Sequence, residues 1–288
     1  KCMQEGLKIL GNALIAVRDL VTCNHPKVAP QRTGEFFDLF QRRVIDEMRG
    51  APFRDDRVES SIRTEQYREI RADEVHLNPP EDHRRSTRRM ASAYAKASNP
   101  LLRTENIMDE LVLLASAHAS EFGEGWSSQL LCDMTGAVTA RTKDLVDGAR
   151  MIARSLGAEW CDIDAGRWGR KVVETNPTLG FKGFPADADC LMGSTIIDFK
   201  ACKGWDPFPT HCKDQMQVMA YAALHLHTRG HKITKLCLIN PISKSVIWRD
   251  VSGVTEAGWI ALLDALGTRT SSAEDEAALA AYKWEPDR

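Results

Sequence analysis

The fold is decided by the stretch Gly183-Phe-Pro-Ala-Asp187-Ala-Asp189-Cys-Leu-Met-Gly-Ser-Thr-Ile-Ile-Asp198-Phe-Lys200, which has the pattern of a tight β-hairpin. Side chains alternate between the two faces of a strand. Asp187 and Asp189 therefore share one face of the first strand, and Asp198 and Lys200 share one face of the second. The stretch predicts a sheet with polar groups at regular positions on two neighbouring strands.

The turn of this hairpin is predicted at Gly193-Ser194, because glycine adopts the positive φ that tight hairpins require. A two-residue turn there pairs Asp189 with Asp198 and Asp187 with Lys200. All four polar groups would then point the same way, so that three carboxylates and one amine share a face.

Three acids on one face carry an energetic cost, because like charges directly opposite each other destabilise a sheet. The neighbours Ile196, Ile197 and Phe199 suggest partial burial, which raises that cost. A divalent cation would offset it, since Mg²⁺ is usually held by one or two carboxylates plus water and phosphate oxygens. Such a set suits metal-assisted hydrolysis of a phosphodiester. The alternative is a solvent-facing hairpin with ordinary surface charges.

The composition is that of an ordinary globular protein: of 288 residues, 43% are hydrophobic and 27% charged. Apolar runs of about 18 residues are absent from the sequence, so we expect no membrane span. The net charge of −2 argues against a strongly basic nucleic-acid coat. The eight cysteines form no C-x-x-C pair, so neither a zinc knuckle nor an iron–sulfur cluster is expected. Reduced thiols in a cytoplasmic protein are the simplest interpretation.

Apolar periodicity and turn residues predict the other elements. Helices are expected over 6–20, 35–48, 84–98, 104–120, 126–156, 213–228 and 254–267, and strands over 232–239 and 244–250. Thr33 is a candidate N-cap. This order predicts an α/β (α+β) fold with a central mixed β-sheet flanked by helices. The expected parts are N-terminal helices contributing to the core (1–50), a mainly helical Arg-rich insertion (51–170), the core itself (171–268) and a C-terminal tail (269–288).

Three motifs in this order resemble one known family. They are Gly34-x-x-x-Asp38, then Asp189 with Asp198-Phe-Lys200, then Gln217-Val-Met-Ala-Tyr221. Together they resemble the PD-(D/E)xK nucleases, and within them the RecB-like and lambda-exonuclease-like branch. The resemblance covers 180–250 and, more weakly, 33–48, and it implies a restriction-endonuclease-like core. The chain departs from the family pattern at Asp38, where many relatives have histidine, and it lacks the cysteines of the iron–sulfur members.

The resemblance implies roles for the matching positions. Asp189 and Asp198 would bind Mg²⁺ or Mn²⁺, and Asp38 would complete the metal shell or be an exposed helix acid. Lys200 would position or activate the attacking water and steady the phosphate. Gln217 would hydrogen-bond a phosphate or the region of Lys200.

Four further residues are candidates, and three of them have two interpretations each. Asp187 is either a second-metal ligand or the partner that orients Lys200. Tyr221 either packs in the core or contacts a nucleotide, and it shares a helix face with the glutamine four residues earlier. Glu174, shortly before the first acidic strand, is a candidate ligand that a local helix would bring in. Lys203 either touches the DNA backbone or is an ordinary exposed lysine.

A compact basic run, 83–89, is the candidate DNA-binding segment, and its arginines are Arg84, Arg85, Arg88 and Arg89. A basic run is either a solvated face or a phosphate-binding surface. The segment 51–170 would form a clamp over the substrate or dock a partner protein.

These features predict a Mg²⁺- or Mn²⁺-dependent deoxyribonuclease that hydrolyses phosphodiester bonds of single- or double-stranded DNA. The resemblance implies a setting in recombination, repair or defence against foreign DNA. Two alternatives remain open: a non-catalytic nucleic-acid-binding or assembly subunit that retains the fold, and an RNA nuclease on the same scaffold.

Overall fold

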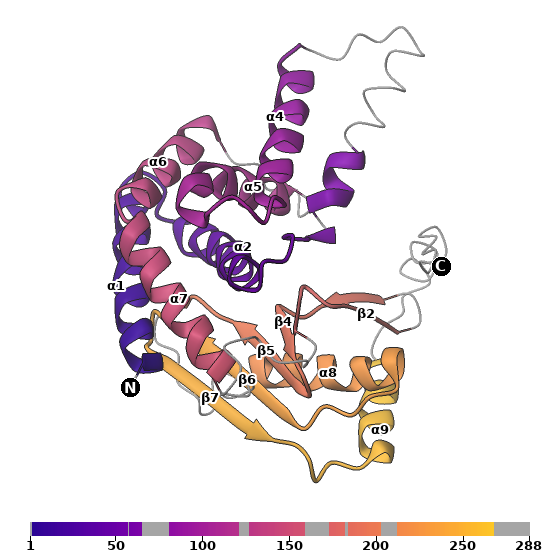
Figure 1. Ribbon diagram of the computed structural model, residues 1–288. Coiled ribbons are helices and arrows are strands. Elements are labelled where there is room, and N and C mark those ends of the chain that lie inside the picture. The colour runs from indigo at the N-terminus through magenta and orange to yellow at the C-terminus, as the bar shows by residue number, and fades with distance from the viewer. Residues whose placement is uncertain are drawn as a thin grey trace, which may run out of the picture. The chain divides into compact units, whose positions relative to one another are not determined.

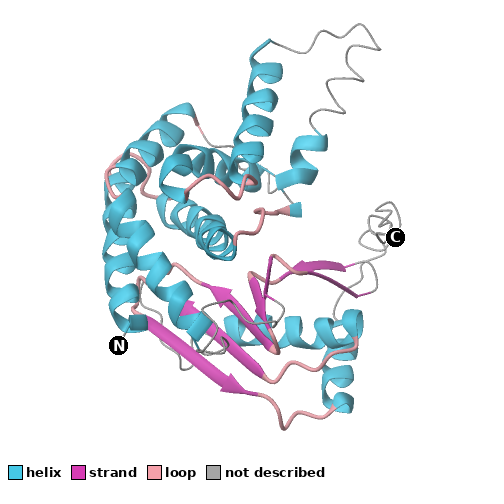
Figure 2. Ribbon diagram, viewed as in Figure 1, coloured by secondary structure: helices cyan, strands magenta, loops and turns pink. Residues whose placement is uncertain are grey.

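The computed structural model describes residues 2–56, 58–64, 81–120, 127–158, 173–181, 184–202 and 212–267. They form two compact units, one of helices and one of strands and helices (Figures 1 and 2). The first unit holds the described residues up to 158 together with 200–202 and 240–245, and the second holds the remainder. The protein is therefore α+β, with its N-terminal helices clustered among the other helices of the first unit.

The first unit is built from helices that follow one another along the chain. They are α1 (Cys2–Thr22), α2 (Ala29–Arg49), α4 (Glu81–Ala97), the short 3₁₀ helix η1 (Thr104–Ile107), α5 (Met108–Ser120), α6 (Ser128–Thr139) and α7 (Thr142–Ala158). Helices α1 and α7 approach closely through glycines: a Cβ on Gly148 would lie 2.6 Å from the backbone nitrogen of Leu10, and one on Gly6 would lie 2.9 Å from Cβ of Met151. Larger residues at these two positions would force the helices apart.

Helix α2 buries charged as well as apolar residues. The rings of Phe36 and Phe40 stack with centroids 5.5 Å apart. Arg42, 1% exposed, forms ion pairs with Asp38 and with the fully buried Asp55, each at 2.8 Å. A buried ion pair of this kind holds its elements in one arrangement, because removing either partner leaves a charge uncompensated.

A second ion-pair network joins α2 to η1 and α7. Glu47 accepts hydrogen bonds from the backbone nitrogen and the hydroxyl of Thr104, and Arg150 on α7 pairs with both Glu47 and Glu105. Burial would raise the pKa of Glu47, but the bonds from Thr104 and Arg150 outweigh burial and hold this pKa below its ordinary value. The network fixes η1 against the two longer helices.

Two predictions about these helices are wrong. Thr33 is not an N-cap: α2 begins at Ala29 with a proline in its first turn, and the Thr33 hydroxyl donates to the carbonyl of Ala29 at 2.8 Å. Proline is well suited to a first turn, so the helix starts earlier than the threonine suggests. The stretch 126–156 is two helices, α6 and α7, separated by the turn at residues 140–141.

The second unit has a five-stranded sheet in the order β1-β4-β5-β6-β7. Its strands are β1 (Val173–Thr175), β4 (Cys190–Met192), β5 (Thr195–Phe199), β6 (Lys235–Asn240) and β7 (Ser245–Asp250). Strands β1, β4 and β5 are antiparallel neighbours, whereas β5 and β6 are parallel. The predicted mixed sheet is therefore confirmed. A separate antiparallel pair consists of β2 (Thr178–Phe181) and β3 (Phe184–Asp187).

Two helices complete the second unit. Helix α8 (Cys212–Arg229) connects β5 to β6 and packs against β5, and it ends at Gly230 with φ 68°, the left-handed conformation typical of a C-cap. Helix α9 (Glu256–Gly267) packs on α8 and buries Trp259 and Leu263. No helix in the described ranges combines the length and hydrophobicity needed to cross a bilayer.

Candidate functional site

The register of the β4–β5 hairpin is the one predicted from its turn. Cys190 pairs with Ile197 and Met192 with Thr195, so Gly193 and the following serine form a two-residue turn, with φ 60° at the glycine. The next pair of positions in this register is Asp189 and Asp198. The hairpin therefore brings these two acids to the same end of neighbouring strands.

A hydrogen bond defines the position of the first acid. Oδ2 of Asp189 accepts from the backbone nitrogen of Phe199 at 2.6 Å, which is the peptide directly after Asp198. The backbone carbonyl of Asp189 in turn accepts from the nitrogen of Asn176 at 3.0 Å. These two bonds fix Asp189 at the end of β5.

Asp198 is placed by burial. Every residue of β5 is buried, and Asp198 is 2% exposed on a strand between β4 and β6, where its register partner on β6 is Leu238. Electrostatic interactions are stronger in such a low-dielectric environment than in water. A carboxylate buried at this position therefore requires hydrogen-bond donors or a positive charge to compensate it.

The prediction of one continuous acidic strand is wrong, because the chain bends between Asp187 and Asp189. Asp187 ends β3 and pairs with Thr178 of β2 in the separate two-stranded sheet, rather than opposite Lys200. At the bend, Asp189 is bonded to two other segments of the chain. Its backbone carbonyl accepts from the nitrogen of Asn176, and its side chain accepts from the nitrogen of Phe199. Lys200 follows directly after β5 and is half-buried.

The predicted pair on α8 shares one helix face, as expected. Nε2 of Gln217 donates to the hydroxyl of Tyr221 at 2.6 Å, and both side chains are half-buried. The same face continues at intervals of four residues through His225 and Arg229. His225 is 4% exposed and contacts a backbone carbonyl at 3.0 Å through Nδ1. α8 therefore carries a polar row along its length.

The last member of this row binds a residue that the sequence marked as a candidate ligand. Arg229 holds both carboxylate oxygens of Glu174 on β1, with Nη2–Oε1 at 2.8 Å. The hydrogen bonds that Arg229 donates to Glu174 raise the pKa of Arg229 above its ordinary value. Glu174 thus ties β1 to the end of α8. Sequence reasoning missed Arg229, although its spacing of four and eight residues from His225 and Tyr221 could have revealed it.

Asp38 belongs to the first unit and is bound there by an arginine. Nε and Nη2 of Arg42 contact Oδ1 and Oδ2 of Asp38 at 3.1 and 2.8 Å. In the ranges that the structure describes, no three His, Cys, Asp or Glu side chains form a group able to hold a metal ion. The two acids that the hairpin register brings together are Asp189 and Asp198. Two carboxylates fit Mg²⁺, which keeps several waters, better than zinc, which takes three or four protein ligands.

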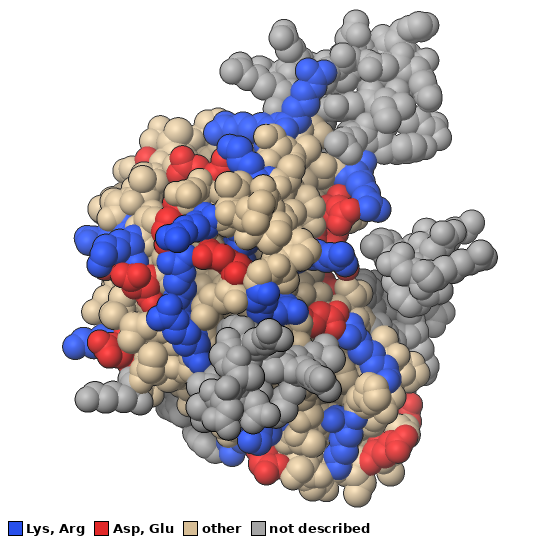
Figure 3. All heavy atoms as spheres, viewed as in Figure 1, with Lys and Arg blue, Asp and Glu red and all other residues tan. Residues whose placement is uncertain are grey.

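The basic candidates are only partly described. Arg88 and Arg89 lie on α4 with exposed side chains. Arg84 and Arg85 belong to the same helix, but their side chains lie outside the described residues, and so does the whole of Lys203. On the coloured surface visible in Figure 3, Lys and Arg are interspersed with Asp and Glu.

Compared with models of protein families, with curated proteins and with solved structures, the chain gives no match in any of the three. Function is therefore inferred from the residues of the hairpin and of α8.

Proposed function

We propose that the protein is a Mg²⁺- or Mn²⁺-dependent nuclease that hydrolyses phosphodiester bonds of DNA, in recombination, repair or defence against foreign DNA. One observation carries the proposal: the hydrogen bond of Asp189 to the backbone nitrogen that follows Asp198. This bond holds the first acid of the hairpin against the last residue of β5, directly before Lys200, and so supports a site of the kind that the family resemblance implies.

Asp189 and Asp198 would hold the divalent ion. When bound, the ion would supply positive charge that stabilises the transition state and would lower the pKa of a water. The hydrogen bond from the Phe199 nitrogen engages one oxygen of Asp189 through a neutral donor.

Lys200 would contribute a compact positive charge beside the two acids. Lysine acts as a point charge with three donors, so it can hold a phosphate oxygen or orient a water. Gln217 and Tyr221 would act as a unit, because the hydrogen bond between them fixes the tyrosine hydroxyl relative to the helix. The exposed arginines of α4 would bind DNA phosphates whatever the base sequence. Their contribution to the affinity for DNA should weaken as the salt concentration increases.

One observation favours a second candidate function, a non-catalytic nucleic-acid-binding subunit. Asp38, the third ligand that the resemblance implies, is bound by Arg42. Calorimetry with Mn²⁺ separates the two functions, because the non-catalytic subunit would bind DNA without binding the ion.

The test is cleavage of end-labelled single-stranded DNA, double-stranded DNA and RNA by the full chain with Mg²⁺ or Mn²⁺. We expect cleavage of DNA that EDTA abolishes. Asp198→Asn and Lys200→Met should each lower the rate by about a hundredfold or more, the scale of losing a catalytic group. Asp264→Asn on α9 and Lys235→Met on β6 are matched exposed controls and should cleave at the wild-type rate. Wild-type rates in both site variants would refute the assignment, and cleavage of RNA alone would make the protein a ribonuclease.

A further inference from the structure

A border strand of the sheet has the features of a docking edge. Among the strands that the structure describes, β7 has a neighbour on one side only, β6. A strand at the border presents backbone N–H and C=O groups along its outer side, which can pair with an added strand. The second half of β7, Trp248 to Asp250, is exposed. β7 is therefore, with β1 at the other border, one of two positions at which the described sheet can be extended.

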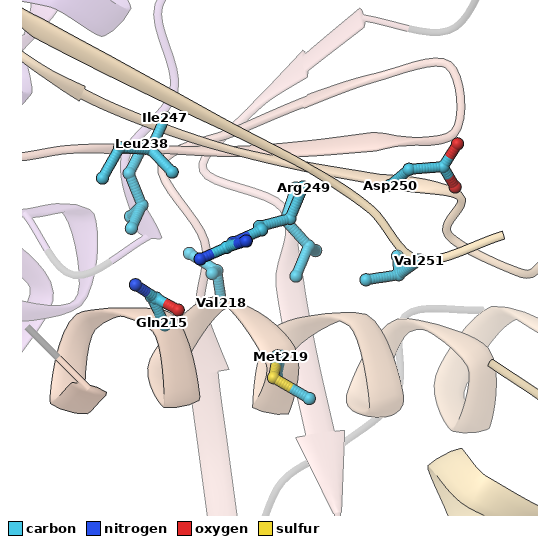
Figure 4. Close-up of a pocket in the computed structure, with 9 residues that line it drawn as sticks. Gln215, Val218, Met219, Leu238, Ile247, Arg249, Asp250 and Val251 are labelled. Atoms are coloured by element: carbon cyan, nitrogen blue, oxygen red, sulfur yellow. The ribbon is translucent and has the colours of Figure 1, made fainter. Parts of the chain in front are cut away.

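A small cavity lies directly beside the same strand, between β7 and α8 (Figure 4). Its volume is about 130 Å³. Its wall includes Val218 and Met219 of α8, Leu236 and Leu238 of β6, and Ile247 and Arg249 of β7. The wall is thus mainly apolar, with the side chain of Arg249 directed towards α8 (Figure 4).

The size of the cavity indicates what it can hold. Pockets for cofactors and drug-sized ligands measure roughly 300–1,000 Å³. A dry cavity of about 150 Å³ admits a molecule the size of benzene. The cavity beside β7 therefore fits one apolar side chain rather than a cofactor.

The pleat of β7 connects the edge with the cavity. Ile247 and Arg249 are two residues apart and so lie on the same face of the strand, the face that lines the cavity. A strand added beside β7 would direct every second side chain to this face. One of these side chains would reach the apolar wall, and the next on the same face, two residues away, would reach Arg249.

We propose that β7 and this cavity bind an extended peptide segment of another protein, which adds a strand to β7. The segment seats one apolar side chain in the cavity and directs an acidic side chain, two positions away, towards Arg249. In this mode the main chain supplies affinity, while the pocket and the arginine supply specificity. The proposal is independent of the nuclease activity, because none of these residues belongs to the proposed catalytic set.

The test is selection of binders to the full chain from a display library of random octapeptides, followed by titration of the selected peptides in synthetic form. We expect the selected sequences to share an apolar residue with Asp or Glu two positions away. Met219→Phe fills the cavity and should weaken binding by about tenfold or more, the value of one buried apolar side chain. Met216→Phe is the matched control, because Met216 lies on the same helix, is 41% exposed and is not part of the cavity wall. Binding should also slow hydrogen exchange of the β7 amides.

Three results would overturn the proposal. The first is that the library yields no peptide whose binding Met219→Phe weakens more than Met216→Phe does. The second is that sedimentation shows a dimer with β7 amides protected in the absence of peptide, which would make a second copy of the chain the occupant. The third is that an apolar probe such as indole fills the cavity while the selected peptides leave the β7 amides unprotected.

Discussion

Replacement of Asp189 separates two roles of its carboxylate, the support of the hairpin that the structure shows and the cation binding that we propose. The structural role is the hydrogen bond to the nitrogen of Phe199, at 2.6 Å, on a residue that is 5% exposed. Asp189→Ala removes the acceptor of a buried donor, which costs about 1–3 kcal/mol. Asp189→Asn keeps a carbonyl oxygen for the same donor and loses the charge, so it should cost less than about 1 kcal/mol.

The cation-binding role responds differently to the same two changes. Neither alanine nor a neutral amide replaces a carboxylate as a ligand of Mg²⁺ or Mn²⁺, so both variants should lose ion binding and cleavage. We therefore expect Asp189→Ala to lose stability and ion binding, and Asp189→Asn to lose ion binding alone. Urea denaturation measures the free energy of unfolding, and calorimetry with Mn²⁺ measures the ion affinity.

The control for both variants is Asp264→Asn, an exposed acid on α9. Equal stability of Asp189→Ala and the wild type would refute the hydrogen bond as a support of β5. Wild-type Mn²⁺ affinity in Asp189→Asn would refute the residue as a ligand, whatever the stability of the alanine variant.

Three further predictions concern the stability of the fold. Gly148→Ala places a Cβ 2.6 Å from the backbone of α1 and should lower the free energy of unfolding, measured by urea denaturation, by about 1–3 kcal/mol. The control Gly136→Ala places a Cβ with nothing within 4 Å and should stabilise its helix by up to about 1 kcal/mol. Equal effects of the two substitutions would refute the close packing of α1 and α7. Arg42→Met leaves the fully buried Asp55 without its ion-pair partner and should cost about 3–5 kcal/mol, measured in the same way, and a cost below about 1 kcal/mol would contradict that pairing. Burial holds the pKa of His225 below its ordinary value, so the folded state resists protonation. The contribution of His225 to the free energy of unfolding should be complete above the unfolded-state pKa of about 6.5 and should fall as the pH drops through that value towards the folded pKa. If the free energy of unfolding of His225→Gln depends on pH with the same slope as that of the wild type, this assignment is wrong.

The sequence predicted local features of the fold well, because local chemistry determines them. Gly193 can adopt the positive φ of a two-residue turn, and that turn alone fixes which residues of β4 and β5 face each other. Gly230 likewise ends α8 where the sequence placed its end. The register and the helix boundary needed no knowledge of distant residues.

The features that the sequence did not predict depend on contacts between distant segments. The bend that separates Asp187 from Asp189 carries bonds to Asn176, in the connection between β1 and β2, and to Phe199 of β5. The pairing of Glu174 with Arg229 joins residues 55 positions apart. Periodicity describes one element at a time, so it does not reveal which acid will be bound by a backbone donor and which by an arginine.

This difference in binding partners distinguishes the hairpin acids from Asp38. Arg42 brings a full positive charge to Asp38, with two short contacts, and so neutralises the carboxylate. Asp189 accepts a hydrogen bond from a backbone N–H, which orients the carboxylate at the end of β5. A divalent ion at Asp38 would have to compete with a guanidinium that is itself 1% exposed and also holds Asp55. Binding of an ion at Asp38 would therefore require this buried ion-pair network to rearrange, and we expect Asp38 to contribute to the stability of α2 rather than to a metal site.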